Sequence, residues 1–198
     1  MDSVNTRTTH WARKVLPARE QAQVRDRWLL HRLDTVLPRL MEKEGLDMWI
    51  VIAREYNEDP VLLTLSSATT LSARRRTMLV FSKQSDGTVD RLMIARSGPG
   101  RAGLYKGVWK ADEDQWEALA RVVAERDPSR IGVNVSDTFA FGDGLSHTEY
   151  NLLSLALGPQ YMTRVQFAEN LAVGWLEERT QEELAAYPTI VGITHEII

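Results

Sequence analysis

A chain of 198 residues in which 43% are hydrophobic and 26% are charged has the composition of a globular domain and not of a disordered segment. The net charge of -3 argues against nucleic acid as the main partner, because phosphate binding requires a basic face. No cysteine is present, which excludes disulfides and thiolate metal sites, and no apolar run approaches the ~20 residues that span a membrane. Cytoplasm is the expected location, with a periplasmic or secreted one open if a leader has been removed.

The chain begins with an arm and a long helix. Residues 1–20 lack an apolar leader and are expected to form a loose N-terminal arm. Apolar residues then recur at helical spacing, which predicts a helix over residues 21–44. Pro38 should bend this helix because it removes one backbone hydrogen bond, and Gly45 suits the position just after the last turn.

A buried strand and a hairpin come next. Residues 48–53 form a continuous apolar run rich in β-branched side chains, which predicts a strand buried on both faces. Residues 77–81 and 91–95 flank a polar loop that contains Asp86 and Gly87. This pattern indicates a β-hairpin, because Gly tolerates the positive φ that tight turns require.

Helices and strands alternate in the second half of the chain. Asp112 is predicted to cap a helix that ends before Pro128, and residues 131–135 predict the following strand. Ser146 and Glu149 have the spacing of a capping box, in which the Glu side chain returns to the N-cap backbone.

That helix should stop at Gly158-Pro159, and residues 161–167 predict a last strand. The complete order predicts an α/β fold with a mixed β-sheet that contains a hairpin and is flanked by helices.

The last nineteen residues, 180–198, predict a further helix that has no stop signal. Thr180 and Glu183 form a second capping box, whereas no Gly, Lys or Arg closes the segment. Either this helix docks its end onto the core of the same domain, or, as we expect, the chain is one domain cut from a longer protein. The apolar face of the helix, formed by Leu184, Tyr187, Val191 and Ile198, should then be exposed, disordered or buried against another copy of the chain.

The most polar loop follows the buried strand directly. It reads Arg54-Glu55-Tyr56-Asn57-Glu58-Asp59-Pro60, and such loops at the carboxyl ends of strands often bind ligands in α/β proteins. Its acids are candidates for acid/base chemistry or for hard-metal ligation. The alternative is a solvated loop in which Asn57 and Asp59 form turns.

Three other motifs have structural explanations. His147 and Glu149 form an H-x-E pattern, but we interpret Glu149 as the capping-box acid. The run 74–76, three consecutive arginines, is interpreted as a solvated strand end, with an anionic substrate or an acidic partner as the alternative. The G-x-G-x-x-G pattern over residues 98–103 does not lead into a clear helix and is interpreted as a flexible loop.

Three stretches of the chain together resemble the creatinase/prolidase/Xaa-Pro aminopeptidase family of metallopeptidases. RWLLHRLDTVLPRLMEKEGLDMWIVIAREYNEDP, residues 27–60, is similar to the opening helix and first strand of the family's N-terminal domain. The hairpin stretches TMLVF and DRLMIAR follow in their expected place. ENLAVGWLEERTQEELAAYPTIVGITHEII, residues 169–198, resembles the linker and first helix of the catalytic domain.

The resemblance implies a non-catalytic N-terminal domain over residues 21–170, with residues 171–198 as linker and truncated helix. It places catalysis in a C-terminal "pita-bread" domain that binds two divalent metal ions (Mn, Co or Zn), and none in this chain. The expected partners are that catalytic domain and a second copy in a homodimer. The resemblance also makes the loop after the first strand a candidate for substrate access or an interface, through Arg54, Glu55, Tyr56, Asn57 and Asp59.

Two other hypotheses stay open at this stage. A stand-alone module could use the same fold to dimerise or to bind a ligand. An independent hydrolase could use Glu55, Glu58 or Asp59, in which case a deep pocket should lie at that loop.

Overall fold

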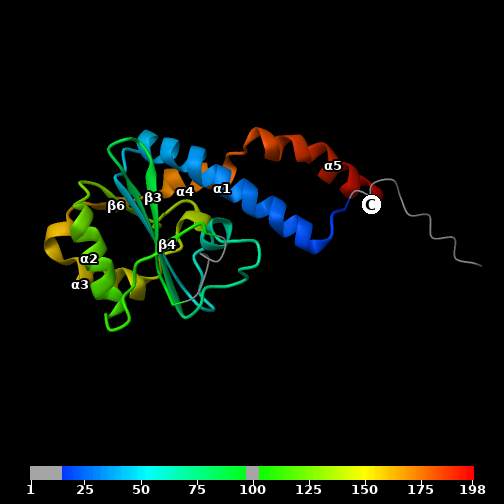
Figure 1. Ribbon diagram of the computed structural model, residues 1–198. Coiled ribbons are helices and arrows are strands. Elements are labelled where there is room, and N and C mark those ends of the chain that lie inside the picture. The colour runs from blue at the N-terminus through cyan, green and yellow to red at the C-terminus, as the bar shows by residue number, and fades with distance from the viewer. Residues whose placement is uncertain (1–14, 97–102) are drawn as a thin grey trace, which may run out of the picture.

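The computed structural model describes residues 15–96 and 103–198 and has three layers, with one mixed sheet between two layers of helices (Figure 1). The strands are β1 (Met48–Arg54), β2 (Arg76–Lys83), β3 (Val89–Ile94), β4 (Lys106–Gly107), β5 (Ile131–Val133) and β6 (Val165–Phe167). The helices are α1 (Ala18–Lys43), α2 (Gln115–Arg126), α3 (His147–Met162), α4 (Glu169–Glu177) and α5 (Gln181–Ile197), with short 3-10 helices η2 (Leu62–Leu65) and η4 (Ala140–Gly142). The predicted mixed α/β architecture is confirmed.

The strand order is β4-β3-β2-β1-β5-β6. β2 pairs antiparallel with both of its neighbours, β1 and β3, and the other pairings in the sheet are parallel. The carboxyl ends of β1, β3 and β5 therefore meet at one edge of the sheet, together with the start of β2. This topology brings segments that are distant in sequence to a common edge, where ligands often bind in α/β proteins.

β1 lies in the middle of the core, as its apolar run predicts. Trp49, Val51 and Ala53 face the layer of α1 and α4, and the alternate residues Met48, Ile50 and Ile52 face the layer of α2 and α3. All six are buried, so the prediction of a strand buried on both faces is confirmed.

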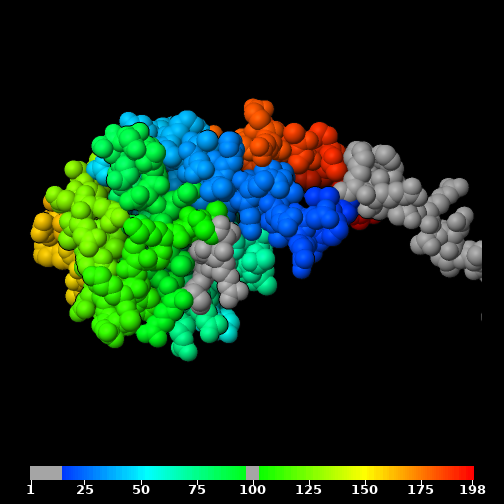
Figure 2. All heavy atoms as spheres, viewed as in Figure 1, coloured from blue at the N-terminus to red at the C-terminus, as the bar shows by residue number. Residues whose placement is uncertain are grey.

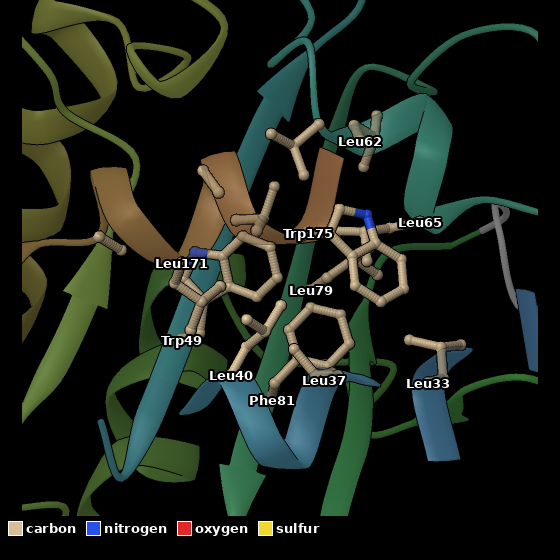
Figure 3. Close-up of a cluster of buried hydrophobic side chains, with 14 of the residues drawn as sticks. Leu33, Leu37, Leu40, Trp49, Leu62, Leu65, Leu79, Phe81, Leu171 and Trp175 are labelled. Carbon is tan, nitrogen blue, oxygen red and sulfur yellow. The ribbon is translucent and has the colours of Figure 1, made fainter. Parts of the chain in front are cut away.

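The α1 side of the core is shown in Figure 3. The ring of Trp49 stacks on Phe81 with centroids 5.3 Å apart, and Leu37 and Leu40 of α1 pack beside them. Trp175 of α4 is fully buried in the same cluster. Sequence reasoning assigned residues 171–198 to a linker and a helix, and it did not anticipate that the first part of this segment forms α4 and completes the core.

Several predicted boundaries need correction. α2 is capped by Asp114 and not by Asp112, because the Asp114 side chain accepts from the backbone N–H groups of Trp116 and Glu117. The helical conformation of α3 is interrupted at Gly158, as predicted, with a φ of 62° and a ψ of 177°, and a further helical turn runs from Pro159 to Met162. Proline at the first position after this interruption is tolerated because its missing N–H has no helical partner there.

The helix α5 begins as predicted and projects from the body. Thr180 and Glu183 form the expected reciprocal capping box. α5 then runs away from the sheet beside the first half of α1, and the two helices form the extension seen in Figure 2. None of its residues is buried, and Leu184, Tyr187, Val191 and Ile198 are all exposed, in agreement with the first of the three expected outcomes.

The predicted arm over residues 1–20 lies mostly outside the described residues. α1 begins at Ala18, so the helix includes the last residues assigned to the arm. The glycine-rich pattern over residues 98–103 also lies outside them except for its last residue.

Candidate functional site

The loop after β1 makes a tight turn at the carboxyl edge of the sheet. The Asn57 N–H donates to the Arg54 carbonyl at 3.0 Å, and the intervening Tyr56 has a φ of 69°. A non-glycine residue with positive φ is uncommon and indicates local strain. The Tyr56 side chain is 94% exposed, so this turn presents an aromatic ring to solvent at the tip of the loop.

Two acids of this loop hold a neighbouring segment in place. The Glu55 carboxylate accepts from the Arg75 N–H at 3.2 Å, and the Glu55 N–H donates to the Arg75 carbonyl at 2.6 Å. Glu58 accepts from the Ala73 N–H at 3.2 Å. The two carboxylates thus position the segment that leads into β2, which is the arrangement expected of a structural loop.

Asp59 differs from Glu55 and Glu58 because it is buried. Its carboxylate accepts from the Val61 N–H and from the Asn134 side-chain amide, each at 2.8 Å, and Asn134 in turn accepts from the Trp49 indole N–H at 2.7 Å. The residue is fully buried. The chain of hydrogen bonds from Asp59 to Trp49 links the loop to the centre of the sheet.

Burial also changes the acidity of Asp59. Loss of solvation raises the pKa of the Asp59 carboxyl to about 6, and the nearby negative charge of Asp143 acts in the same direction. The hydrogen bonds from Asn134 and Val61 lower the pKa and offset part of this effect. Gly144 packs directly against the carboxyl group, since a Cβ at that position would lie 2.2 Å from the Asp59 Cγ.

Glu149 has a different role from the one its motif predicts. Ser146 does cap α3 by accepting from the Glu149 N–H at 3.4 Å, but the Glu149 carboxylate accepts from Arg76, with Nε–Oε2 at 2.7 Å and Nη2–Oε1 at 3.1 Å. Arg54 lies 3.5 Å from the same carboxylate. The interpretation of Glu149 as a capping-box acid was wrong, because the bidentate pairing of Arg76 with its buried carboxylate provides stronger charge-assisted hydrogen bonds.

Arg76 connects four elements at this edge of the sheet. Its guanidinium lies 5.0 Å above the Trp116 ring of α2 while it pairs with Glu149 of α3. The Gln115 side-chain amide donates to the backbone carbonyls of Arg76 in β2, at 3.0 Å, and of Ile94 in β3, at 2.8 Å. These contacts fix both the backbone and the side chain of Arg76.

Two adjoining hollows open at this edge and share Arg75 and Arg76. The larger, of about 540 Å³, is called the arginine pocket here and is lined by Arg74, Arg75, Arg76, Arg96, Trp109 and Gln115. The smaller, of about 310 Å³, is lined by Arg54, Glu55, Tyr56, Arg75 and Arg76.

Two lining residues of the arginine pocket, Arg96 and Trp109, make further contacts. The Arg96 guanidinium lies 5.2 Å from the centre of the Trp109 ring, and the Trp109 indole N–H donates to the Glu113 carbonyl at 2.8 Å. Glu113 is held in turn by Arg121, with Nε–Oε1 at 2.6 Å, and this hydrogen bond lowers the pKa of the Glu113 carboxyl to about 2.

The structure therefore brings together some of the predicted site residues and separates others. Arg54, Glu55 and Tyr56 line the smaller hollow, Asn57 closes the turn, and Asp59 is buried with Asn134. Sequence reasoning did not identify Arg96, Trp109 or Glu149 as neighbours of this loop. The run of three arginines at residues 74–76 was the one signal for a charged site.

Within residues 15–96 and 103–198, no three His, Asp or Glu side chains are grouped so that they could hold a metal ion. In the same part of the chain, no helix combines the length and the apolar character needed to cross a membrane.

No protein-family model, curated protein or solved structure matches the chain.

Proposed function

We propose that this chain is the non-catalytic N-terminal domain of an Xaa-Pro aminopeptidase/prolidase-like metallopeptidase, where it contributes to oligomerisation and shapes access to the active site. The resemblance of residues 27–60 and 169–198 to that family supports the proposal. The six-stranded mixed sheet flanked by helices is compatible with it. In the intact protein, two divalent metal ions in a C-terminal domain would activate the water that attacks the peptide carbonyl.

The observation that carries the proposal is the contrast between the two ends of α5. Its start is fixed: Arg32 of α1 donates to the carbonyls of Trp175 and Glu178 and pairs with the Glu183 carboxylate at 3.2 Å. Beyond this first turn α5 has no buried residue. Its apolar side chains are about half exposed, with Leu184 at 47% and Ile190 at 51%.

A helix with one fixed end and an uncovered apolar stripe is typical of an element that docks onto another surface. We infer that the catalytic domain covers this stripe, and that the start of α5 sets the angle at which the two domains meet.

The exposed turn at Tyr56 is the proposed contribution to substrate access. Tyr56 projects into solvent from a turn that Glu55 and Arg75 hold in place. An aromatic ring on a rigid support loses little conformational entropy when it is covered, which suits an interface or the rim of a neighbouring active site.

The first test is the reading frame beyond Ile198. The proposal expects on the order of 200 further residues, the size of an ordinary domain, that contain the Asp, Asp, His, Glu and Glu ligands of a two-metal site. A stop codon directly after Ile198 would contradict the proposal and favour a stand-alone module.

The second test compares two polypeptides in one assay. With Mn²⁺ present, the longer polypeptide should hydrolyse an Xaa-Pro dipeptide, and residues 1–198 alone should not. Turnover by residues 1–198 would instead favour the independent hydrolase, and Glu55→Ala would then be the variant that identifies its acid. Tyr56→Ala in the longer polypeptide should raise KM more than it lowers kcat, with the exposed Leu71→Ala as a control.

A further inference from the structure

We propose that the arginine pocket is a binding site for a small phosphorylated molecule. Its volume of about 540 Å³ lies within the range of small-molecule sites. Four arginines and one tryptophan line it, and it opens at the edge of the sheet where β2 begins and β3 ends. This site is independent of the proposed peptidase function.

The charge of the pocket is only partly balanced. Arg76 is paired with Glu149, but Arg74, Arg75 and Arg96 form no ion pair within the described part of the chain. Three unbalanced guanidinium groups around one cavity repel one another in a protein whose net charge is -3. A bound anion would remove this repulsion, which is the simplest reason for such a cluster.

Two of the pocket arginines, Arg75 and Arg96, are held by contacts with neighbouring residues. Arg75 has a φ of 53°, and the two backbone hydrogen bonds to Glu55 hold it in this strained conformation. Arg96 lies over the ring of Trp109, which is itself hydrogen-bonded to Glu113. The backbone of Arg75 and the side chain of Arg96 are therefore held in place before binding, which reduces the entropy lost when a ligand binds.

Arginine chemistry selects the ligand class. The planar guanidinium presents paired N–H donors that match two oxygens of a phosphate group, and several arginines together match a group with more than one negative charge. Trp109 adds an aromatic wall beside these donors. The limited volume of the pocket and the acidic net charge of the chain favour a small soluble phosphate compound over nucleic acid or a membrane surface.

Calorimetric titration of the chain with sodium pyrophosphate tests the proposal. The experiment is run at constant ionic strength against sodium chloride, so that general screening is the same throughout. We expect saturable binding with one site per chain. A Kd of about 1 mM is taken as the limit of weak binding, and pyrophosphate is added to about ten times that concentration. The proposal would be overturned if neither binding heat nor a shift in melting temperature is then observed.

Matched arginine variants locate the binding. Arg74→Gln and Arg96→Gln should each weaken pyrophosphate binding by about tenfold, since each removes a charge-assisted hydrogen bond. Arg27→Gln on the exposed surface of α1 makes the same change in net charge and should leave the affinity within about twofold. Equal weakening in all three variants would overturn the proposal, because it would show binding to net charge alone.

A second arm separates a soluble phosphate from a phospholipid headgroup. Vesicles that contain phosphatidylserine should not bind the chain under the same conditions. Vesicle binding that Arg74→Gln abolishes, in the absence of pyrophosphate binding, would overturn the proposal in favour of a membrane contact. Circular dichroism of each variant confirms that the fold is retained, as expected for exposed side chains outside ion pairs.

Discussion

The two long helices α1 and α5 have similar apolar patterns but differ in how much of each helix is buried. α1 buries seven residues, most of them against the sheet, and α5 buries none. Each helix contains a proline, and each places apolar side chains on one face. This difference shows that apolar periodicity identifies the helix face that can be covered, whereas the burial of that face depends on the surface packed against it. For α1 the opposing surface is the sheet, whereas α5 has no buried residue along its length within the described part of the chain.

The largest expected effect comes from deleting equivalent leucine side chains from the two helices. Leu37→Ala in α1 should lower the free energy of unfolding by about 3 kcal/mol, because it leaves a cavity beside Trp49 and Phe81. Leu184→Ala in α5 should change it by less than about 0.5 kcal/mol. Urea denaturation at a concentration where the chain is monomeric measures both, and equal losses would show that α5 is already covered.

The next largest effect concerns the Arg32 node, which is the set of contacts that Arg32 of α1 makes with Trp175, Glu178 and Glu183 at the start of α5. Arg32→Ala should destabilise the chain by about 3 kcal/mol, because it leaves the Trp175 carbonyl and the Glu183 carboxylate without their buried donor. Its control is Arg39→Ala, which removes a more exposed pair with Glu178 and should lower the unfolding free energy by less than about 1 kcal/mol. Thermal unfolding gives the comparison, and similar values for the two variants would mean that the node does not anchor α5.

The next effect concerns the buried carboxyl group of Asp59 and its response to pH. Because the pKa of Asp59 is raised from 3.8 to about 6 in the folded chain, the folded state binds a proton more tightly than the unfolded state does. Stability should therefore increase by about 1 kcal/mol from this group as the pH falls from about 7 to about 5, and the gain should level off once the pH is below the unfolded pKa.

The control for this pH dependence is Asp59→Asn, which removes the titrating group. Its free energy of unfolding, followed by urea denaturation across the same pH range, should lack the rise. A rise of unchanged size in Asp59→Asn would assign the effect to another carboxyl group.

The smallest expected effect is confined to α5. Thr180→Ala removes the side chain that accepts from the Glu183 N–H and should destabilise the start of the helix by about 1 kcal/mol. Because α5 has no buried residue, we expect faster amide exchange within α5 and little change in the melting temperature. Thr194→Ala in the same helix is the control and should leave the exchange of the first turn unchanged.

Local patterns in the sequence were sufficient for most elements. The apolar run at residues 48–53 predicted β1, the Asp86-Gly87 turn predicted the hairpin, and the spacing of Thr180 and Glu183 predicted the start of α5. Each of these signals lies within one short segment, so no tertiary information is needed to interpret it.

Features that depend on distant segments were missed. Arg76 and Glu149 meet only because β2 begins beside α3, and this contact replaces the capping role that local spacing predicted for Glu149. Arg96 and the arginines of residues 74–76 line one cavity because β2 and β3 pair antiparallel. The burial of Asp59 likewise depends on Asn134, seventy-five residues away.

Amide exchange of α5, followed by mass spectrometry, tests the central claim most directly. It compares residues 1–198 with a longer polypeptide that includes the next domain of the same reading frame. We expect α5 beyond Glu183 to exchange rapidly in the short chain and at least about tenfold more slowly in the longer one, while α1 remains equally protected in both. Equal exchange of α5 in the two polypeptides would contradict the claim that its apolar face is covered by a catalytic domain.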